Sequence, residues 1–123
     1  MFRLDDRIRQ LRARQDAPGG PPRNLAHIAL SQARADPDRV VIVDDKVEIT
    51  RATMLDMALR LGASLQGRGV AKGAVIAFQL PNWWEACVVN LACALFGFRL
   101  GPLLTIYRRA ELNTLLPACG VSA

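Results

Sequence analysis

The sequence has few of the residues from which catalytic and metal sites are usually built. It contains one histidine, His27, in 123 residues. A catalytic triad needs a nucleophile, a base and an orienting group, and a metal site usually needs several ligands. His27 falls on a helix of surface type and has no evident partner in the sequence. We therefore interpret it as structural, and we expect neither a catalytic residue nor a metal ligand in this chain.

Cysteine is also scarce, with only Cys87, Cys93 and Cys119. Their spacing fits neither a CxxC motif nor a zinc pattern. Two of them lie inside an apolar run, where a free thiol behaves as a small hydrophobic group. An odd cysteine count without a signal peptide favours a reducing compartment, so we expect a cytoplasmic protein.

No hydrophobic run is long enough to cross a membrane. The most apolar stretch, residues 83–96, contains Glu85 and Asn90, whereas a transmembrane helix needs about 20 apolar residues. We interpret this stretch as a buried helix and expect no transmembrane segment. Apolar residues make up 51% of the chain and charged residues 22%, which is ordinary for a globular domain and excludes disorder throughout.

The positive charge is not gathered into a nucleic-acid-binding surface. The net charge is +5, from 16 Lys and Arg against 11 Asp and Glu. Much of the basic excess lies in residues 1–23, and the remainder is spread along the chain. A nucleic-acid-binding protein usually combines a basic stripe with a known module, and none is present. We expect no nucleic-acid partner.

The chain divides into an arm and a folded region. Leu4, Ile8 and Leu11 have helical spacing among arginines, which predicts a short amphipathic helix. The proline- and glycine-rich run at 18–22 then interrupts regular structure. We assign residues 1–23 to an N-terminal arm with a Pro/Gly linker, and residues 24–123 to the folded region.

The folded region alternates helical and β patterns. Asn24 and Thr50 are good helix caps, and the apolar spacing within the first two helices defines one side of each. In the first helix this side is Leu25, Ile28, Ala29 and Gln32, and in the second it is Met54, Ala58, Leu61 and Leu65. The first predicted helix follows the Asn24 cap and runs to Ala35, and the second follows the Thr50 cap and ends at Gly67. The other predicted helices are 83–96 and 109–118, and the predicted strands are 40–43, 47–49, 74–80 and 98–100.

The order of these elements predicts the fold class. The first two strands flank a short turn and form a small β-hairpin. From residue 74 onward the order is strand, helix, strand, helix, which is typical of a parallel sheet with right-handed crossovers. Val121 would begin a third parallel strand. We predict an α/β fold with a β-hairpin and a parallel βαβα sheet fragment, with helices packed on it.

The glycine-rich segment at 67–73 is superficially similar to a phosphate-binding loop. Such a loop must follow a strand and open a helix, so that helix N–H groups face the phosphate. This segment follows a helix and opens a strand, and it lacks a Gly-Lys-Ser/Thr ending. We interpret it as a helix stop followed by a turn.

A string of consecutive motifs nevertheless resembles one family. The sequence reads VIVD at 41–44, EIT at 48–50, GVAKG at 69–73, VIAFQLPNWWE at 75–85 and LACA at 91–94. In order and spacing, this is similar to the N-terminal region of AMP-forming acyl-CoA synthetases, the AMP-dependent synthetase and ligase family, over residues 24–123. It looks closest to the branch that activates fatty, alicyclic or aromatic acids. The chain departs from the family pattern at Arg51, where an aromatic residue is common, and at Thr53, Ala74 and Gly101-Pro102.

The resemblance implies a function for the intact family. Its members join a carboxylic acid to ATP with Mg²⁺, and then transfer the acyl group to CoA. The phosphate loop, the magnesium-binding Glu, the ribose-binding Asp and the C-terminal Lys are all missing here. We therefore expect an incomplete N-terminal subdomain of such a ligase, inactive alone and without its own cofactor. A non-catalytic interaction module and a small nucleotide- or CoA-binding protein are the alternatives.

Two further expectations concern particular residues. The resemblance implies that Thr105, Ile106 and Tyr107 belong to a CoA-facing loop, with the Tyr107 ring against the nucleotide. Trp83 and Trp84 open an apolar helix, so we expect both to be structural and at least one to be buried. Because that helix is apolar almost all round, we also expect self-association through exposed apolar surface.

Overall fold

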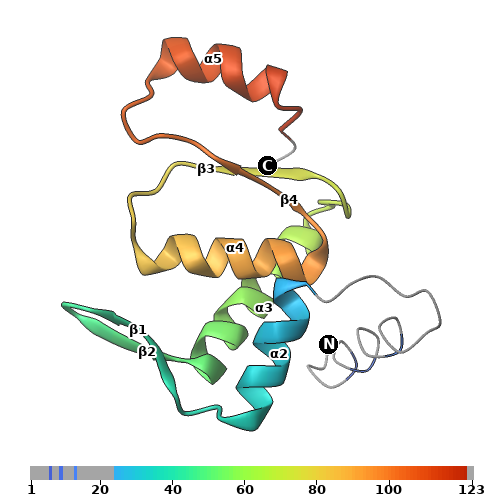
Figure 1. The fold of residues 1–123 in the computed structure, drawn as a ribbon. Coiled ribbons are helices and arrows are strands. Elements are labelled where there is room, and N and C mark those ends of the chain that lie inside the picture. The colour runs from blue at the N-terminus through green and yellow to red at the C-terminus, as the bar shows by residue number, and fades with distance from the viewer. Residues whose placement is uncertain (1–5, 7–8, 10–12, 14–23, 122–123) are drawn as a thin grey trace.

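The computed structural model describes residues 24–121 and three isolated helical positions before them, residues 6, 9 and 13. The predictions for the arm and the linker otherwise lie outside the described residues. Figure 1 shows the arrangement of the elements. In chain order they are α2 (Leu25–Ala35), β1 (Val40–Asp44), β2 (Val47–Thr50), α3 (Arg51–Gly67), β3 (Val75–Phe78), α4 (Trp84–Phe96), β4 (Arg99–Pro102) and α5 (Arg109–Ala118).

Both predicted helix caps are present. The Asn24 side chain accepts a hydrogen bond from the backbone N–H of His27 at the start of α2. The Thr50 hydroxyl oxygen accepts from the N–H of Thr53 at 3.2 Å, at the start of α3. Each bond satisfies a backbone donor that the first helical turn leaves free. The α2 and α3 boundaries therefore follow directly from local sequence.

The predicted parallel sheet is present, with its third strand begun. β3 pairs with β4 in parallel, from Val75 opposite Arg99 to Phe78 opposite Pro102. Val75 also forms a parallel bridge with Val121, so β3 lies between β4 and the start of a third strand. Figure 1 shows α4 on one side of this sheet and α5 on the other. The hairpin of β1 and β2 is a separate antiparallel sheet.

The core lies on the α4 side of the sheet, where α2, α3 and α4 meet. Leu95 and Cys93 of α4 are its largest fully buried side chains. By contrast, α5 has no buried residue. Its side of the sheet therefore contributes little apolar burial, the main favourable term in folding. No described helix is long and apolar enough to cross a membrane.

The structure corrects two expectations about side-chain exposure. α2 turns Ala26, His27 and Leu30 into the core, so His27 is buried and its Nδ1 accepts a hydrogen bond from the Asn24 N–H. Neither tryptophan is fully buried, since Trp83 is 52% exposed and Trp84 is half-buried. Both stand at the N-terminal end of α4 and line a hollow beside the hairpin, and Trp84 also packs against the edge of the core.

Gly62 sets the distance between α3 and α4. It is buried within α3, and a Cβ atom at this position would overlap the ring of Phe96 near the end of α4. The Phe96 ring is itself stacked on Phe98, with ring centroids 5.9 Å apart. Only the absence of a side chain at position 62 lets the two helices approach this closely.

Replacing Gly62 with Ala should therefore destabilise the fold. Alanine in a helix interior normally stabilises by up to about 1 kcal/mol relative to glycine, but overpacking a core typically costs about 1–3 kcal/mol. We expect a net loss of about 1–2 kcal/mol in the free energy of unfolding by urea. Gly67→Ala is the matched control, because position 67 ends the same helix and faces open space; it should leave stability unchanged or raise it slightly. A stabilised Gly62→Ala variant would contradict this account.

Candidate functional site

The predicted site residues Thr105, Ile106 and Tyr107 lie in the loop between β4 and α5. This loop follows the carboxyl end of a parallel strand, the edge at which ligands of α/β sheets tend to bind. Thr105 and Ile106 are exposed, Ile106 to 73%, whereas Tyr107 is half-buried. The structure thus brings the three residues together in one loop and presents two of them to solvent.

Gln79 holds this loop in place. It follows the last residue of β3, and its side-chain amide donates to the carbonyl oxygens of Leu104 at 2.7 Å and Tyr107 at 2.9 Å. The backbone N–H of Tyr107 donates to the Leu104 carbonyl at 3.1 Å, which closes the turn. One side chain just after β3 therefore fixes both ends of the turn that carries Thr105 and Ile106.

Arg108 braces the same loop from its other side. One guanidinium nitrogen donates to the carbonyls of Thr105 at 2.7 Å and Tyr107 at 3.2 Å. The backbone N–H of Arg108 donates to the Glu111 carboxylate at 2.8 Å, and this bond is the main cause of a lowered pKa for Glu111. Glu111 is thus held as an anion near the N-terminus of α5, where a negative charge is favoured.

The backbone of the loop is fixed, and its side chains at 105–107 remain available for contacts. Its carbonyls are engaged by Gln79 and Arg108, and the side chains that remain available are a hydroxyl, an aliphatic group and a phenol ring. Among the described residues, no group of three or more His, Cys, Asp or Glu lies close enough to hold a metal ion. We derive no metal-dependent step through the described part of the chain.

The sequence analysis missed Gln79. Its motif was recognised, but only as part of a family resemblance and without a role for the glutamine. The available indication was its position, since a polar side chain directly after a buried apolar strand lies at the ligand-binding edge of the sheet. Which carbonyls it would bind depends on residues 25 and 28 positions further along the chain, and no local pattern encodes that pairing.

Comparison with known proteins finds the same family that the sequence motifs resemble. Residues 30–123 match the family model described as AMP-binding enzyme. The chain is 38% identical over 97 residues to the medium-chain fatty-acid–CoA ligase of Escherichia coli, covering 78% of this chain and 17% of that protein. It is 31% identical over 105 residues to a 2-hydroxy-7-methoxy-5-methyl-1-naphthoate–CoA ligase of Streptomyces carzinostaticus, covering 82% of this chain and 18% of that protein.

Solved structures share the fold. The N-terminal subdomain of Klebsiella oxytoca NpsA superposes with a TM-score of 0.73 at 23% identity, covering 81% of this chain and 26% of the subdomain. The α/β arrangement of this chain, with its hairpin and parallel strand pair, is thus that of an N-terminal adenylation subdomain. The matched region is only a part of that subdomain. The chain spans less than a fifth of the length of each of the two ligases compared above.

Removing the Gln79 amide should loosen the loop without disturbing the sheet. Gln79→Leu deletes both hydrogen bonds to the Leu104 and Tyr107 carbonyls, each contributing a net of about 0.5–1.5 kcal/mol. We expect faster amide hydrogen exchange across residues 104–108 and unchanged exchange across Val75–Phe78. Gln66→Leu, at an exposed position of α3, should change neither region. If amide exchange at residues 104–108 is equally fast in Gln79→Leu and in the unsubstituted chain, Gln79 does not hold the loop in place.

Proposed function

We propose a function for this chain on one premise: it belongs to the AMP-binding enzyme family. We infer that it is the N-terminal part of an ATP-dependent acyl-CoA ligase. The observation that carries the proposal is the 38% identity over 97 residues to a medium-chain fatty-acid–CoA ligase. The similarity to a naphthoate–CoA ligase supports fatty and aromatic carboxylic acids as the substrate class. We place the reaction in the cytoplasm, because an odd number of cysteines, three, favours a reducing compartment.

The proposed reaction has two steps. A carboxylate oxygen of the acid attacks the α-phosphorus of ATP, and pyrophosphate leaves with the charge of the broken bond. The CoA sulfur then attacks the acyl carbon of the adenylate, AMP leaves, and the thiol proton passes to solvent. Both steps need donors that neutralise phosphate charge at the reacting centre. The family's phosphate loop and magnesium-binding Glu are missing from this sequence, so we assign that chemistry to the rest of the ligase.

The contribution we propose for this chain is to bind CoA through the loop at 103–108. The loop lies at the carboxyl edge of β3 and β4, is fixed from two sides, and presents Thr105 and Ile106 outward. The Tyr107 ring is half-buried beside them and can stack on an adenine base. A loop that is ordered before its ligand arrives avoids part of the entropy cost of binding.

The chain alone should form no acyl-adenylate. We expect pyrophosphate release from ATP to stay at background for a panel of fatty and aromatic acids, because this sequence lacks the family's phosphate loop, magnesium-binding Glu and C-terminal Lys. Pyrophosphate release above background that disappears when this chain is mutated would show that the chain forms acyl-adenylate by itself and would contradict the prediction. Contaminating ligase activity is controlled for by a mock preparation from cells lacking the chain.

The CoA-binding role is tested in a chimera in which this chain replaces the aligned 97 residues of the E. coli ligase. Tyr107→Ala should raise the KM for CoA by about fivefold or more, since stacking of an aromatic ring on a base contributes about 1–3 kcal/mol. Adenylate formation, measured by pyrophosphate exchange, should be unchanged. Tyr107→Phe keeps the ring and should behave as the parent. Equal loss in both half-reactions would indicate a folding defect instead.

A further inference from the structure

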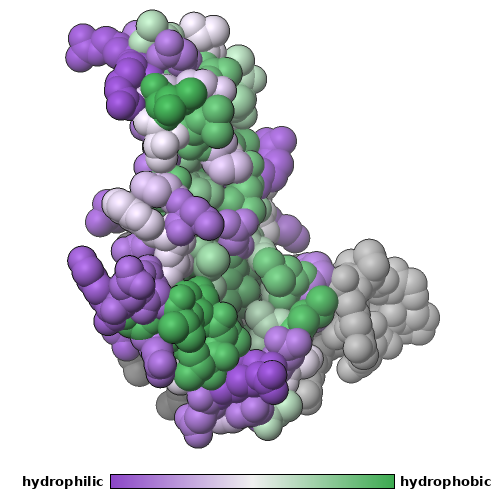
Figure 2. Space-filling model, turned by 60° about the vertical axis from the view of Figure 1, so that its left-hand side comes forward, coloured by the Kyte–Doolittle hydropathy of each residue, from purple (hydrophilic) through white to green (hydrophobic). Residues whose placement is uncertain are grey.

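An open groove runs beside α4, between α2 and the hairpin. Its inner part encloses about 390 Å³ and is lined mainly by apolar side chains, among them Leu25, Val41, Met54 and Leu91. Its outer part encloses about 550 Å³ next to Val43 and Trp83. Cys87 lines both parts, so we treat them as one Cys87 groove. Figure 2, turned toward the hairpin side, shows hydrophobic surface exposed among hydrophilic residues.

The groove is flanked by apolar groups that are costly to leave in water. Leu25 is 54% exposed and Val43 73% exposed, and full burial of such a side chain contributes about 1.5–3 kcal/mol. The hairpin adds a second unfilled feature, because within the described part of the chain β1 pairs only with β2, and a two-stranded hairpin by itself is marginally stable. These features favour an apolar polypeptide segment as the occupant.

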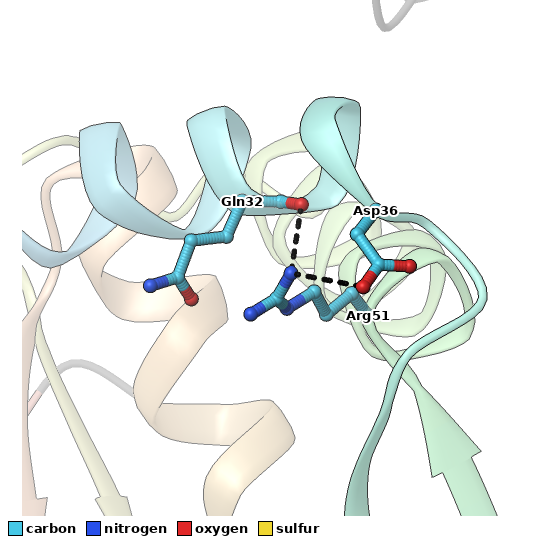
Figure 3. Close-up of polar contacts among 3 residues, drawn as sticks. All are labelled: Gln32, Asp36 and Arg51. Carbon is cyan, nitrogen blue, oxygen red and sulfur yellow. Dashed lines mark hydrogen bonds and ion pairs between the residues drawn. The ribbon is translucent and has the colours of Figure 1, made fainter.

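Arg51 adds a charge requirement to this apolar groove. Its side chain is only 18% exposed and lies at the groove wall, in the first turn of α3. Figure 3 shows its two contacts, both long: one guanidinium nitrogen lies 3.4 Å from the Gln32 carbonyl and 3.9 Å from an Asp36 carboxylate oxygen. Its buried Nε has no hydrogen-bond partner among the described residues.

The position of Arg51 makes its charge still less favourable. A cation at a helix N-terminus opposes the helix dipole, and the first turn of α3 contains no acidic residue to offset it. A largely buried charge without a close partner is destabilising, whereas a carboxylate beside a guanidinium forms short, charge-assisted hydrogen bonds. The groove therefore calls for an acidic group next to an apolar surface.

We propose that the Cys87 groove is the docking site for an apolar segment carrying an Asp or Glu, supplied by the rest of an adenylate-forming ligase. This inference rests on the proposed function. The length of the relatives supports it: the same fold makes up only 26% of a solved N-terminal subdomain, so most of that unit lies outside the matched region. A second copy of this chain fits less well, since the net charge of +5 repels like copies.

Cys87 provides a direct reporter of occupancy. It is free and exposed in the groove, while Cys119 is free and exposed after α5. Cys93 is buried, and burial raises its thiol pKa, so it should react slowly. The rate of alkylation by a maleimide, read by mass spectrometry of the peptide containing each cysteine, thus compares the groove with an internal control in the same molecule.

The experiment uses the full chain in place of the aligned 97 residues of the E. coli ligase. Docking should slow the alkylation of Cys87 by about tenfold or more compared with the isolated chain under the same conditions, because thiol reactivity follows exposure. Arg51→Glu should abolish this protection. The substitution places an acidic residue in the first turn of α3, where a negative charge interacts favourably with the helix dipole. The helix should therefore remain folded, and a loss of Cys87 protection would report a docking defect.

Arg60→Glu is the matched control. It makes the same charge reversal in the same helix, at an exposed residue that forms an ion pair with Asp56 at 2.9 Å, and it should leave Cys87 protected. A chimera that melts cooperatively while Cys87 reacts as fast as in the isolated chain would overturn the proposal. Protection of Cys87 without CoA-ligase activity would instead support docking and count against the proposed function.

The isolated chain gives an independent measurement if the chimera does not fold. The proposal requires an open groove, so Cys87 should react at a rate that does not depend on chain concentration. If the Cys87 rate falls as concentration rises while the Cys119 rate does not, a second copy fills the groove and the proposal is wrong.

Discussion

The contact between Gly62 and Phe96 is the constraint on which the rest of this structure depends. It lets α3 and α4 lie closer than any residue with a side chain at position 62 would allow. α4 in turn connects β3 to β4, and Phe96 and Phe98 bring the end of α4 onto the start of β4. The position of the parallel strand pair, and therefore of the loop at its carboxyl edge, follows from this one helix–helix distance.

Apolar side chains are buried mainly on one side of the parallel sheet. Residues on the α4 side of the sheet form one continuous core with α2 and α3, while α5 on the opposite side has no fully buried residue. Protein interiors are normally packed to crystal-like density on every apolar face. In this α/β unit one face of the sheet is covered by a buried core and the other is not, which is consistent with the matched region being about a quarter of a solved adenylation subdomain.

The two functional features use polar groups in opposite ways. At the loop, the Gln79 amide and the Arg108 guanidinium meet carbonyl oxygens at distances of 2.7–3.2 Å, so the polar groups are satisfied and the backbone is held. In the groove, Arg51 has only contacts of 3.4 and 3.9 Å and a buried donor with no described partner. A satisfied network fixes a conformation, whereas an unsatisfied one indicates where a partner group is missing.

The sequence by itself determined the local elements and their order. The caps at Asn24 and Thr50, the hairpin, the parallel β3–β4 pair and the start of a third strand at Val121 were all predicted from it, because caps, turns and apolar periodicity act over a few residues. Tertiary structure alone decided the burial of His27, the exposure of Trp83, the link from Gln79 to the loop and the environment of Arg51. Each of these depends on groups that are distant in sequence or on how far a neighbouring element extends. Helical spacing determines which residues share a face of a helix, but it does not determine which face another element covers.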